Sequence, residues 1–431
     1  MNKEIRQAYA ILKKVYDNKA YAGIELNKTL NRETFNINSK LITKIVYGVI
    51  ERDIYLDYTI SKFVKNKPDS SVLLLLKIGT YIIKNINSIP VFACVNEIVE
   101  IAKIETDKYA AGFVNATLKN ISKKDIALPD KDKNLKQYLS VKYSYPIWLV
   151  DALLKEHNAE FVEELLSYNL TTLTHIRVLE DKIKIDEFIK LLENKQIEYQ
   201  HSAFNNTLYV EYSQILKIKD LKDKYIVQGL PSIITSKNVP DTAINVLDLC
   251  ASPGGKSIYI AQNNPDAIVT SCDINEGRVE LIKKFANSYD VKNINILMND
   301  ATILREEWID KFDAVICDVP CSNLGITNKK PDVLLNRNEN TVSSLKDTQL
   351  AILRTAANYV KKGGTLIYST CSIMKEENEK IVGLFLKDNK DFIVSNVETF
   401  GVQVDKFHNL VTFYPHISKC EGFFIGRLTR K

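Results

Sequence analysis

The sequence of 431 residues is poor in the residues that build structural metal sites. It has five histidines and seven cysteines, and no two cysteines are spaced as CxxC. This pattern gives no support to a structural zinc site, so no metal cofactor is expected. An odd number of cysteines in a chain of this length indicates free thiols in a reducing compartment.

Long apolar segments are absent as well. The N-terminus, MNKEIRQAYA, has no apolar signal-peptide core. The most apolar stretch runs from Val72 to Ile83 and contains Lys77, so it is too short to span a bilayer and predicts a buried helix. We therefore expect a cytoplasmic protein without a membrane partner.

The overall composition is that of an ordinary globular protein, with 45% hydrophobic and 26% charged residues. The net charge of +5 and the pI of about 8.5 are compatible with a nucleic-acid partner but do not establish one. A chain of 431 residues exceeds the usual size of one core, which predicts two or three domains. There is no internal repeat or low-complexity tract.

Apolar periodicity divides the chain into three parts. Residues 1–121 predict an all-helical bundle, because apolar residues recur at helical spacing (Ile5, Tyr9, Leu12 and Tyr16, for example) and Pro68 and Pro90 precede periodic segments. Residues 122–137 are charged and poor in large apolar residues, which predicts a linker. Residues 138–239 mix short helical and strand patterns and predict a small α+β domain.

Residues 240–431 show a different pattern, in which short β-branched runs alternate with helix-compatible segments. The runs are Val246–Leu249, Ile268–Cys272, Ile294–Leu297, Ala314–Cys317 and Leu366–Tyr368. Alternating strands and helices predict a parallel sheet with right-handed crossovers. Ligands of such sheets bind beyond the C-terminal ends of the strands.

A glycine-containing loop, CASPGGKS, follows the first of these strands at residues 250–257. Paired glycines allow close approach of a ligand to the backbone, and the next helix begins with exposed amide donors. A P-loop would need glycine where Cys250 stands, and the GxGxxG dinucleotide fingerprint is also absent. The remaining candidate is an adenosine-type ligand without a pyrophosphate.

Two aspartates follow the next two strands. Asp273 is placed to accept hydrogen bonds from ribose hydroxyls, and Asp300 could meet an adenine amino group. Alternatively, each aspartate simply caps the helix that follows it. The glycine loop together with both acids favours the ligand site.

Two cysteines follow the last two strands of the pattern. Asp318 and Cys321 lie in DVPCS, and Cys371 lies in YSTCS. Both thiols are expected to face the crevice of the adenosine-type ligand. The other cysteines are interpreted as small buried apolar residues (Cys94, Cys272, Cys317 and Cys420) or as packing within the glycine loop (Cys250).

A thiol beside a methyl donor suits methylation of carbon 5 of cytosine. Addition of a thiolate to carbon 6 makes carbon 5 nucleophilic; a base later removes the proton at carbon 5 and the thiolate leaves. Asp318 is placed as the acid near N3 of the base, and the site must lower the pKa of the attacking thiol. Chemistry alone does not decide between Cys321 and Cys371 as the nucleophile.

These blocks, in order, resemble the hallmark motifs of the RNA 5-cytosine methyltransferases. The matching segments are CASPGGK, DVPCSNLG, STCS followed by EENE, and the final EGFFIG with Pro415 upstream. IPVFACVNEIVEIAK and AGFVNATLK resemble the NusB-like RNA-binding domain found in the ribosomal RNA branch of this family, and SYPIWLV resembles the start of its middle RNA-binding segment. The resemblance covers nearly the whole chain.

The resemblance implies an activity: S-adenosylmethionine-dependent methylation of carbon 5 of a cytosine in 16S ribosomal RNA. It also implies a Rossmann-like catalytic domain with a mostly parallel seven-stranded sheet. It assigns Cys371 as the nucleophile and Cys321 to resolution of the covalent adduct. The implied cofactor-binding residues are Cys250, Ala251, Ser252, Pro253, Gly254, Gly255, Lys256, Asp273, Arg278, Asp300 and Asp318.

The sequence departs from the family pattern at a few positions. Ser252 stands where alanine is common, and Gly229 stands where an aspartate is typical. Lys329 and Lys330 replace the usual arginine or histidine, which keeps positive charge near an RNA phosphate. None of these changes removes a catalytic group.

The expected partner is RNA with an unpaired or flipped cytosine, bound by a monomer. Lys329, Lys330 and Arg337 are the candidate RNA contacts, although a lysine is usually a solvated surface charge. One alternative is a 5-cytosine methyltransferase for tRNA or another ribosomal site. Another is a non-catalytic NusB-like RNA-binding or antitermination factor, which the intact glycine loop, both cysteines and Asp318 disfavour.

Overall fold

The computed structural model describes residues 2–32 and 38–431 of the chain. These residues form two compact units. The helical unit comprises Met1–Ser167 and Thr327–Glu339, and the catalytic unit comprises Tyr168–Ile326 and Asn340–Lys431. The segment 327–339 is thus distant in sequence from the rest of the helical unit.

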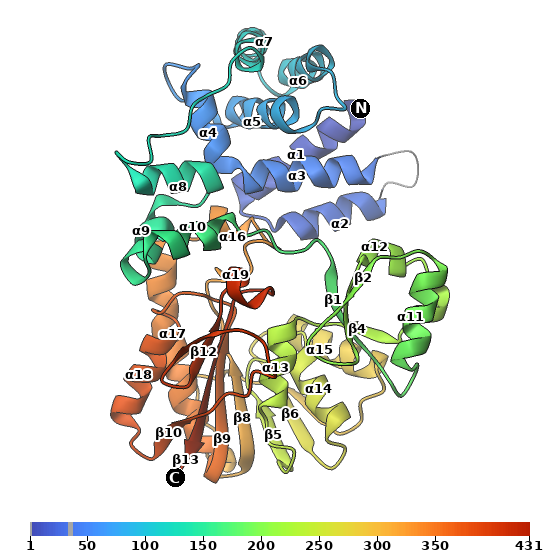
Figure 1. Cartoon of the computed structure of the whole chain (residues 1–431), viewed down its shortest axis with the longest axis vertical. Helices are drawn as coiled ribbons and strands as arrows, with labels where there is room; N and C mark the ends of the chain where they lie inside the picture. The colour runs from blue at the N-terminus through green and yellow to red at the C-terminus, as the bar shows by residue number, and fades with distance from the viewer. Residues whose placement is uncertain (1, 33–37) are drawn as a thin grey trace. The chain divides into compact units, whose positions relative to one another are not determined.

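The helical unit consists of helices joined by short loops (Figure 1). Its elements are α1 (Asn2–Asn18), α2 (Ala22–Arg32), α3 (Ser39–Glu51), α4 (Asp53–Ser61), α5 (Ser70–Asn85), α6 (Val91–Glu105), α7 (Lys108–Ser122), α8 (Leu135–Tyr143), α9 (Ile147–Glu156), α10 (Ala159–Ser167) and α16 (Val333–Asn336). The predicted helical N-terminal part is confirmed, except that residues 33–37 lie outside the described residues. The predicted linker contains the non-helical residues 123–134 between α7 and α8.

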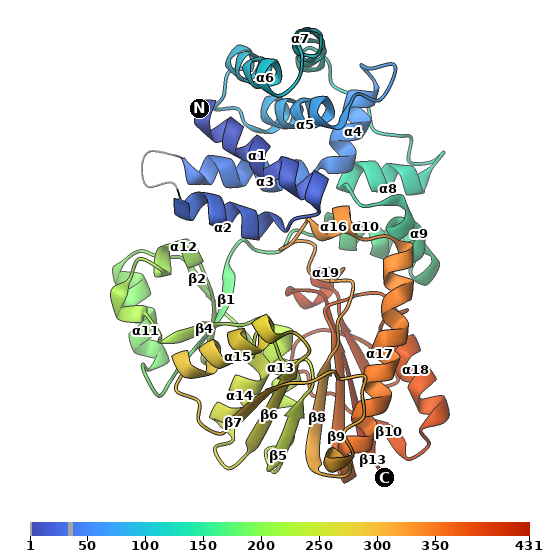
Figure 2. The same cartoon turned by 180° about the vertical axis from the view of Figure 1, so that it is seen from behind.

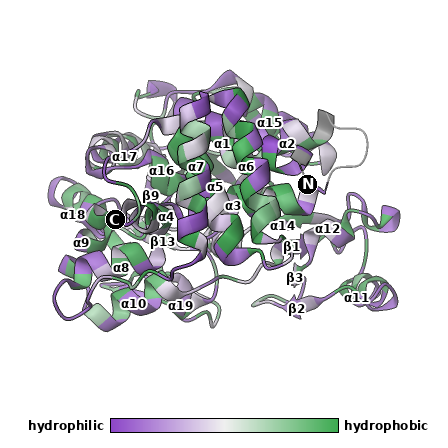
Figure 3. Cartoon of the chain, turned by 90° about the horizontal axis from the view of Figure 1, so that it is seen from above, coloured by the Kyte–Doolittle hydropathy of each residue, from purple (hydrophilic) through white to green (hydrophobic). Residues whose placement is uncertain are grey.

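Amphipathic patterns explain why these segments are helices. In α3 the side chains at Ile42, Ile45, Val46 and Val49 are buried at spacings of three and four residues, so one stripe faces the core. Figure 3 shows hydrophobic and hydrophilic residues alternating along the helices in the same way. The predicted buried helix, α5, is enclosed along most of its length and packs against α3, α4, α6 and α7.

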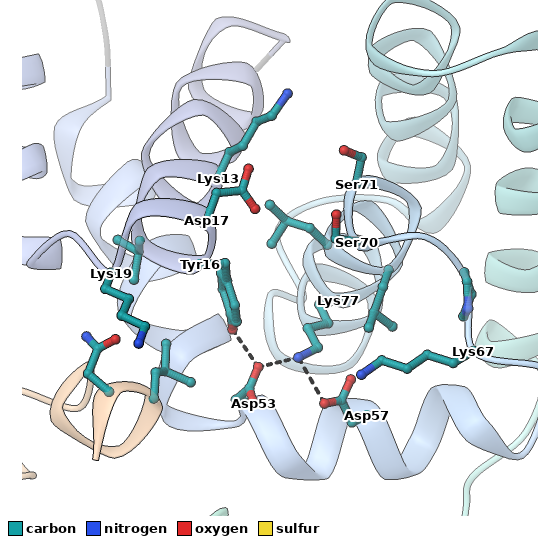
Figure 4. Close-up of a pocket in the computed structure, with 16 residues that line it drawn as sticks. Lys13, Tyr16, Asp17, Lys19, Asp53, Asp57, Lys67, Ser70, Ser71 and Lys77 are labelled. Carbon is teal, nitrogen blue, oxygen red and sulfur yellow. Dashed lines mark hydrogen bonds and ion pairs between the residues drawn. The ribbon is translucent and has the colours of Figure 1, made fainter. Parts of the chain in front are cut away.

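Lys77 is the charged residue inside α5, and the helical unit neutralises it locally. Its Nζ contacts Asp53 and lies 3.0 Å from Asp57 Oδ2, while the hydroxyl of Tyr16 donates to Asp53 at 2.5 Å. A buried ammonium is tolerated only with such partners. This network lines a pocket of about 440 Å³ to which α1, α4, α5 and α16 all contribute (Figure 4).

The catalytic unit begins with a small antiparallel sheet, which lies within the α+β domain predicted for residues 138–239; residues 138–167 of that prediction belong to the helical unit instead. The sheet order is β2-β3-β1-β4. Its elements are β1 (Thr174–Val178), α11 (Ile185–Asn194), β2 (Tyr199–His201), β3 (Thr207–Val210), α12 (Tyr212–Ile215), a 3-10 turn (Lys219–Leu221) and β4 (Tyr225–Val227). Phe188 and Leu192 of α11 lie in the core beneath this sheet.

The second part of the catalytic unit is a large mixed sheet with order β11-β12-β13-β9-β8-β5-β6-β7, and β10 pairs with β13. Its strands are β5 (Asn245–Asp248), β6 (Ile268–Asp273), β7 (Ile294–Met298), β8 (Phe312–Asp318), β9 (Val360–Thr370), β10 (Phe392–Ser395), β11 (Asp405–Phe407), β12 (Leu410–Phe413) and β13 (Phe423–Arg430). Its helices are α13 (Leu230–Lys237), α14 (Gly255–Asn263), α15 (Glu276–Ser288), α17 (Glu339–Tyr359), α18 (Glu379–Asp388) and α19 (Pro415–Ser418), with a 3-10 turn at Glu306–Trp308.

The five predicted strands are confirmed as β5–β9, and they pair in parallel. The predicted number of seven strands was too low, since the described part of this sheet has nine. The difference arises at the C-terminal end, where β10 and β12 both pair antiparallel with β13, and the three-residue β11 then extends the edge beyond β12. Strands this short carry little periodic signal in a sequence.

Helices cover both faces of the sheet, as Figure 2 shows for α14 and α15 and for α17 and α18. Alternate residues of each strand point to opposite faces, so Val246 and Ile316 pack with α13 and α14, whereas Leu247 and Cys317 pack with α17. This two-sided burial explains the continuous apolar runs of the parallel strands. Within the described residues, no helix combines the length and apolarity needed to cross a membrane.

A pair of helical glycines provides a test of packing in the helical unit. A Cβ at Gly48 of α3 would lie 2.0 Å from the ring of Tyr81, whereas a Cβ at Gly112 of α7 would meet nothing within 4 Å. We predict that Gly48→Ala lowers the free energy of unfolding by about 1–3 kcal/mol through overpacking. Gly112→Ala should raise it by up to about 1 kcal/mol. Thermal unfolding of the full chain measures both changes, and equal shifts would contradict the packing described here.

Candidate active site

The predicted site residues gather at one edge of the parallel sheet. Asp248, Asp273 and Asp318 end β5, β6 and β8, and Asp300 follows β7 by two residues. Because β5–β9 are parallel neighbours, their C-terminal ends share this edge. Asp273, Asp300 and Asp318, which the sequence singled out, therefore lie at one edge of the sheet together with Asp248.

The glycine loop adopts the backbone conformation that requires glycine. Gly254 has φ of 111°, in the left-handed region, and it stands at the N-cap of α14. The loop is anchored by Ser257, whose hydroxyl donates to Asp248 Oδ2 at 2.7 Å. Burial raises the pKa of Asp248 to about 6. Its Oδ1 atom is buried and has no hydrogen-bond partner within the protein.

Neither strand-terminal aspartate caps a helix. Asn275, rather than Asp273, caps α15, and Asp273 Oδ1 instead accepts the Asn275 N–H at 3.1 Å. Asp300 Oδ1 accepts the N–H and the hydroxyl of Thr302 in a local turn. The alternative that these acids only cap helices is therefore wrong, and both remain candidates for ligand binding. Arg278 Nη1 lies 3.9 Å from Asp273 Oδ1 on a largely exposed side chain.

The two predicted cysteines converge. Their sulfur atoms are 2.8 Å apart, and neither is in a disulfide. The reason lies in the pairing of β8 with β9, where Asp318 is in register with Ser369. Cys321 lies three residues after Asp318, and Cys371 lies two residues after Ser369. Cys371 Sγ also donates to Asn323 Oδ1 at 2.8 Å.

The two thiols differ in their surroundings. Cys321 is 8% exposed, and its contact with Cys371 together with burial holds the pKa of its thiol well above the usual value. Cys371 is partly exposed. A thiol has only one proton to donate. Because the S–H of Cys371 is used in the hydrogen bond to Asn323 Oδ1, the proton in the hydrogen bond between the two sulfurs comes from Cys321. Cys321 is thus the hydrogen-bond donor and Cys371 the acceptor.

The four cysteines interpreted as structural are buried, as expected. Burial raises the pKa of Cys94 and of Cys272 to about 12, and that of Cys317 well above its usual value. Cys250, within the glycine loop, packs against the core around α17, and burial also raises the pKa of its thiol. Thiols of this kind are poor nucleophiles.

Lys256 links the glycine loop to the cysteines. Its Nζ lies 2.5 Å from Asp318 Oδ2, and the other carboxylate oxygen accepts the hydroxyl of Ser369 at 2.8 Å. Burial acts to lower the pKa of Lys256, but the neighbouring Asp318 outweighs it, so the pKa is raised. The ammonium also lies over the ring of Phe423 at 5.4 Å and therefore stays positively charged.

A buried carboxylate holds the two cysteine loops together. Glu377 Oε2 accepts the hydroxyls of Ser322 and Ser372, each at 2.5 Å, and these serines directly follow the two cysteines. Its Oε1 accepts the Ser322 N–H at 2.8 Å and an amide N–H of Gln349 at 3.0 Å. Next to it, Asn378 accepts from Thr370 and donates to the carbonyl of Ser372. Glu377 belongs to the EENE motif, but the motif alone does not predict this role.

Gly229 lies directly against the side chain of Glu421. A Cβ at Gly229 would lie 1.7 Å from Glu421 Oε1, so the carboxylate of Glu421 fills the space beside this backbone. The next residue, Gly422, donates its N–H to the carbonyl of Gly325 at 2.8 Å, and the Gly325 N–H donates to the carbonyl of Cys371 at 2.9 Å. The departure from the family pattern at 229 is thus matched by an acid from the C-terminal motif.

The three candidate RNA contacts lie in the segment 327–339 of the helical unit. Lys329 and Lys330 are exposed, and Arg337 is partly exposed. Their role remains a prediction. Within the described residues, no group of three or more histidine, cysteine, aspartate or glutamate side chains could hold a metal ion.

Comparison with known proteins agrees with this site. Residues 237–429 match the family model described as "16S rRNA methyltransferase RsmB/F", and residues 3–123 match the NusB family. The probable ribosomal RNA small subunit methyltransferase B of Bacillus subtilis is 30% identical over 442 residues, covering 98% of each chain. This chain belongs to the ribosomal RNA small subunit methyltransferase B family.

Other similar proteins extend this result. Ribosomal RNA small subunit methyltransferase B of Photorhabdus laumondii is 26% identical, with 95% of each chain covered. Among solved structures, PH0851 matches with a TM-score of 0.83 and 23% identity over 100% of this chain and 99% of that chain. A methyltransferase homolog from Pyrococcus horikoshii matches with a TM-score of 0.57 and 21% identity over 68% and 98%. The two matches show that this chain shares the fold of these solved structures.

The Glu377 network predicts how readily the two thiols react with each other. Glu377→Ala leaves four hydrogen-bond donors without their acceptor, so the cysteine loops should separate. We expect the rate of Cys321–Cys371 disulfide formation under mild oxidation to fall about tenfold, measured by mass spectrometry, since thiol exchange depends on access and geometry.

Glu376→Ala is the matched control, because Glu376 is the neighbouring residue and pairs with Lys346 and Lys380 outside the network. It should form the disulfide at the rate of the unmodified chain. A Glu377→Ala chain that oxidises as fast as the control would show that this carboxylate does not position the thiols.

Proposed function

We propose that this protein transfers a methyl group from S-adenosylmethionine to carbon 5 of a cytosine in 16S ribosomal RNA, through a covalent bond between Cys371 and carbon 6 of the base. The observation that carries the proposal is the 2.8 Å approach of two thiols at the ends of adjacent strands. The Lys256–Asp318 pair and the glycine loop lie at the same sheet edge. Family membership supports the choice of 16S ribosomal RNA.

The residues at the sheet edge fit an adenosine-type cofactor. Asp248 Oδ1 and Asn299 Nδ2 are buried and have no hydrogen-bond partner in the protein, so one acceptor and one donor stand ready for a ligand. The glycine loop, Asp273 and Asp300 surround this edge at the positions expected for a ribose and an adenine. When bound, S-adenosylmethionine supplies an electrophilic methyl group. Predicted binding residues from Cys250 to Lys256 and Arg278 complete the proposed set.

The proton arrangement between the sulfurs supports Cys371 as the nucleophile. When Cys371 loses its proton, Cys321 continues to donate a hydrogen bond to the thiolate. Burial acts to lower the pKa of Lys256, but Asp318 outweighs it, so a positive charge is held in the surroundings of Cys371. Cys371 is also the more exposed thiol and can reach carbon 6 of a base.

Asp318 and Cys321 then have separate roles. Lys256 and Ser369 fix the Asp318 carboxylate. Its proposed role is to accept hydrogen bonds from the exocyclic amine and from N3 once N3 has become protonated in the adduct. After methylation a base must take the proton from carbon 5, so that the Cys371–carbon 6 bond breaks. Cys321 is adjacent to that bond, and its proposed role in resolving the adduct is to donate its S–H to the departing sulfur of Cys371.

In this proposal, different parts of the chain have different roles. Residues 240–431 carry the chemistry, while 1–121 and 138–239 bind RNA on either side of the 122–137 linker. Lys329, Lys330 and Arg337 contact RNA phosphates. The target cytosine must be unpaired or flipped, because carbon 6 is inaccessible within a stacked helix.

The two cysteines should respond differently to substitution. Cys371→Ser removes the nucleophile, so methyl transfer should fall by at least about a thousandfold without a covalent RNA adduct. Cys321→Ser should accumulate a protein–RNA adduct that survives denaturation, seen as a shifted band on a denaturing gel. The reverse pattern would exchange the two roles.

The function itself is tested by mapping 5-methylcytosine on 16S RNA from cells with and without this protein. We expect one site to be lost on deletion and restored by the unmodified chain but not by Cys371→Ser. Transfer RNA and 23S RNA are mapped in the same samples. If a site is lost only in transfer RNA or 23S RNA, that RNA is the substrate instead of 16S RNA. If no site is lost in any RNA, the result favours a non-catalytic RNA-binding factor.

A further inference from the structure

The segment that follows the Cys321 loop is anchored in the helical unit rather than in the catalytic unit. The chain leaves the catalytic unit after Ile326 and returns at Asn340. Within this segment Pro331, Asp332 and Val333 are buried, whereas Lys329 and Lys330 are exposed. The two lysines thus lie immediately before a fixed point in the helical unit.

Asp332 is the main polar anchor. Its side chain is only 3% exposed, and its Oδ2 accepts the N–H of Ala22 at 3.2 Å. Ala22 is the first residue of α2, and Tyr21 before it has no side-chain acceptor suited to capping. A carboxylate from 310 positions later in the chain therefore satisfies the N-terminus of α2 and interacts favourably with its dipole.

Two further contacts fix the segment on either side of Asp332. The hydroxyls of Thr327 and Tyr145 are 3.2 Å apart, which ties the start of the segment to the turn before α9. Leu335 of α16 packs on the hydrophobic core of the helical unit. Leu335 and Asn336 also line the pocket that contains the network of Tyr16, Asp53 and Lys77.

The other end of the segment continues from residues fixed in the catalytic unit. Gly325 exchanges backbone hydrogen bonds with Cys371 and Gly422, and a Cβ at Gly325 would lie 2.2 Å from the Gly422 carbonyl oxygen. One residue, Ile326, separates this point from Thr327.

We propose that the helical unit is a positioning element for this segment: by capping α2, Asp332 holds Lys329 and Lys330 in one orientation toward the RNA substrate. The NusB-like part would then orient two RNA-contacting lysines, in addition to any RNA binding of its own. The predicted effect on RNA methylation rests on the proposed function. The predicted anchoring of residues 327–339 does not depend on that function.

The test compares three variants of the full chain. Asp332→Ala removes the acceptor, Asp332→Asn keeps one, and Asp107→Ala removes the side-chain cap that accepts from Ala110 at 2.7 Å on α7 of the same unit. Asp107→Ala is the matched control, since it removes a helix cap without touching 327–339. Hydrogen exchange of the peptide 327–339 and methyl-transfer kinetics on 16S RNA are measured for each.

We expect Asp332→Ala to speed amide exchange in 327–339 and to lower kcat/KM for RNA, each by about tenfold, as loss of one helix-capping interaction allows. Cofactor affinity should stay unchanged, Asp332→Asn should retain most of both properties, and Asp107→Ala should alter exchange only in α7. If Asp332→Ala does not fold, Tyr145→Phe serves instead, because it removes only the contact to Thr327. It should speed amide exchange in 327–339 and lower kcat/KM for RNA, each by about two- to threefold, through the loss of one hydrogen bond.

Unchanged exchange in 327–339 would refute the anchor, and faster exchange with unchanged RNA kinetics would refute its role in positioning. A wild-type chain that methylates no RNA would sink the proposed function, while the exchange data would still decide whether Asp332 orders the segment.

Discussion

Everything in the catalytic unit depends on the parallel pairing of β8 with β9. The register that places Asp318 opposite Ser369 brings the two cysteine loops to one sheet edge. Buried apolar side chains on both faces fix that register, because a slip of one residue would exchange the faces. The hydrogen bonds of Glu377 then complete the approach of Cys321 and Cys371 beyond the ends of the strands.

The site combines groups that have little effect separately. A thiol in a protein is mostly protonated near neutral pH, and a buried lysine tends to lose its charge. Here Asp318 keeps Lys256 protonated although the ammonium is buried. Cys321, whose pKa is raised by the contact with Cys371 and by burial, keeps its proton and remains a donor. The two chemically identical thiols thus differ in their hydrogen bonds: Cys321 donates to Cys371, and Cys371 donates to Asn323.

Sequence patterns predicted much of this arrangement, and physical reasons explain what they missed. The strands β5–β9, the site aspartates and both cysteines could be predicted, since buried parallel strands and their polar ends leave a strong periodic signal. Chemical reasoning from the sequence could not decide which thiol donates to the other. That depends on contacts with Asn323 and Glu377, which form only through tertiary folding. The short strands β10 and β11 and the anchor from Asp332 to α2 were missed for the same reason, since each depends on partners distant in the chain.

The central claim, that Cys371 attacks the base while Cys321 stays protonated, is tested most directly by trapping the covalent intermediate. RNA containing 5-fluorocytosine carries no proton at carbon 5 that a base could remove, so the enzyme–RNA bond should persist after methylation. Digestion and mass spectrometry would then locate the modified nucleotide. The account predicts the nucleotide on the peptide that contains Cys371; its recovery on Cys321, or no covalent complex at all, would contradict it.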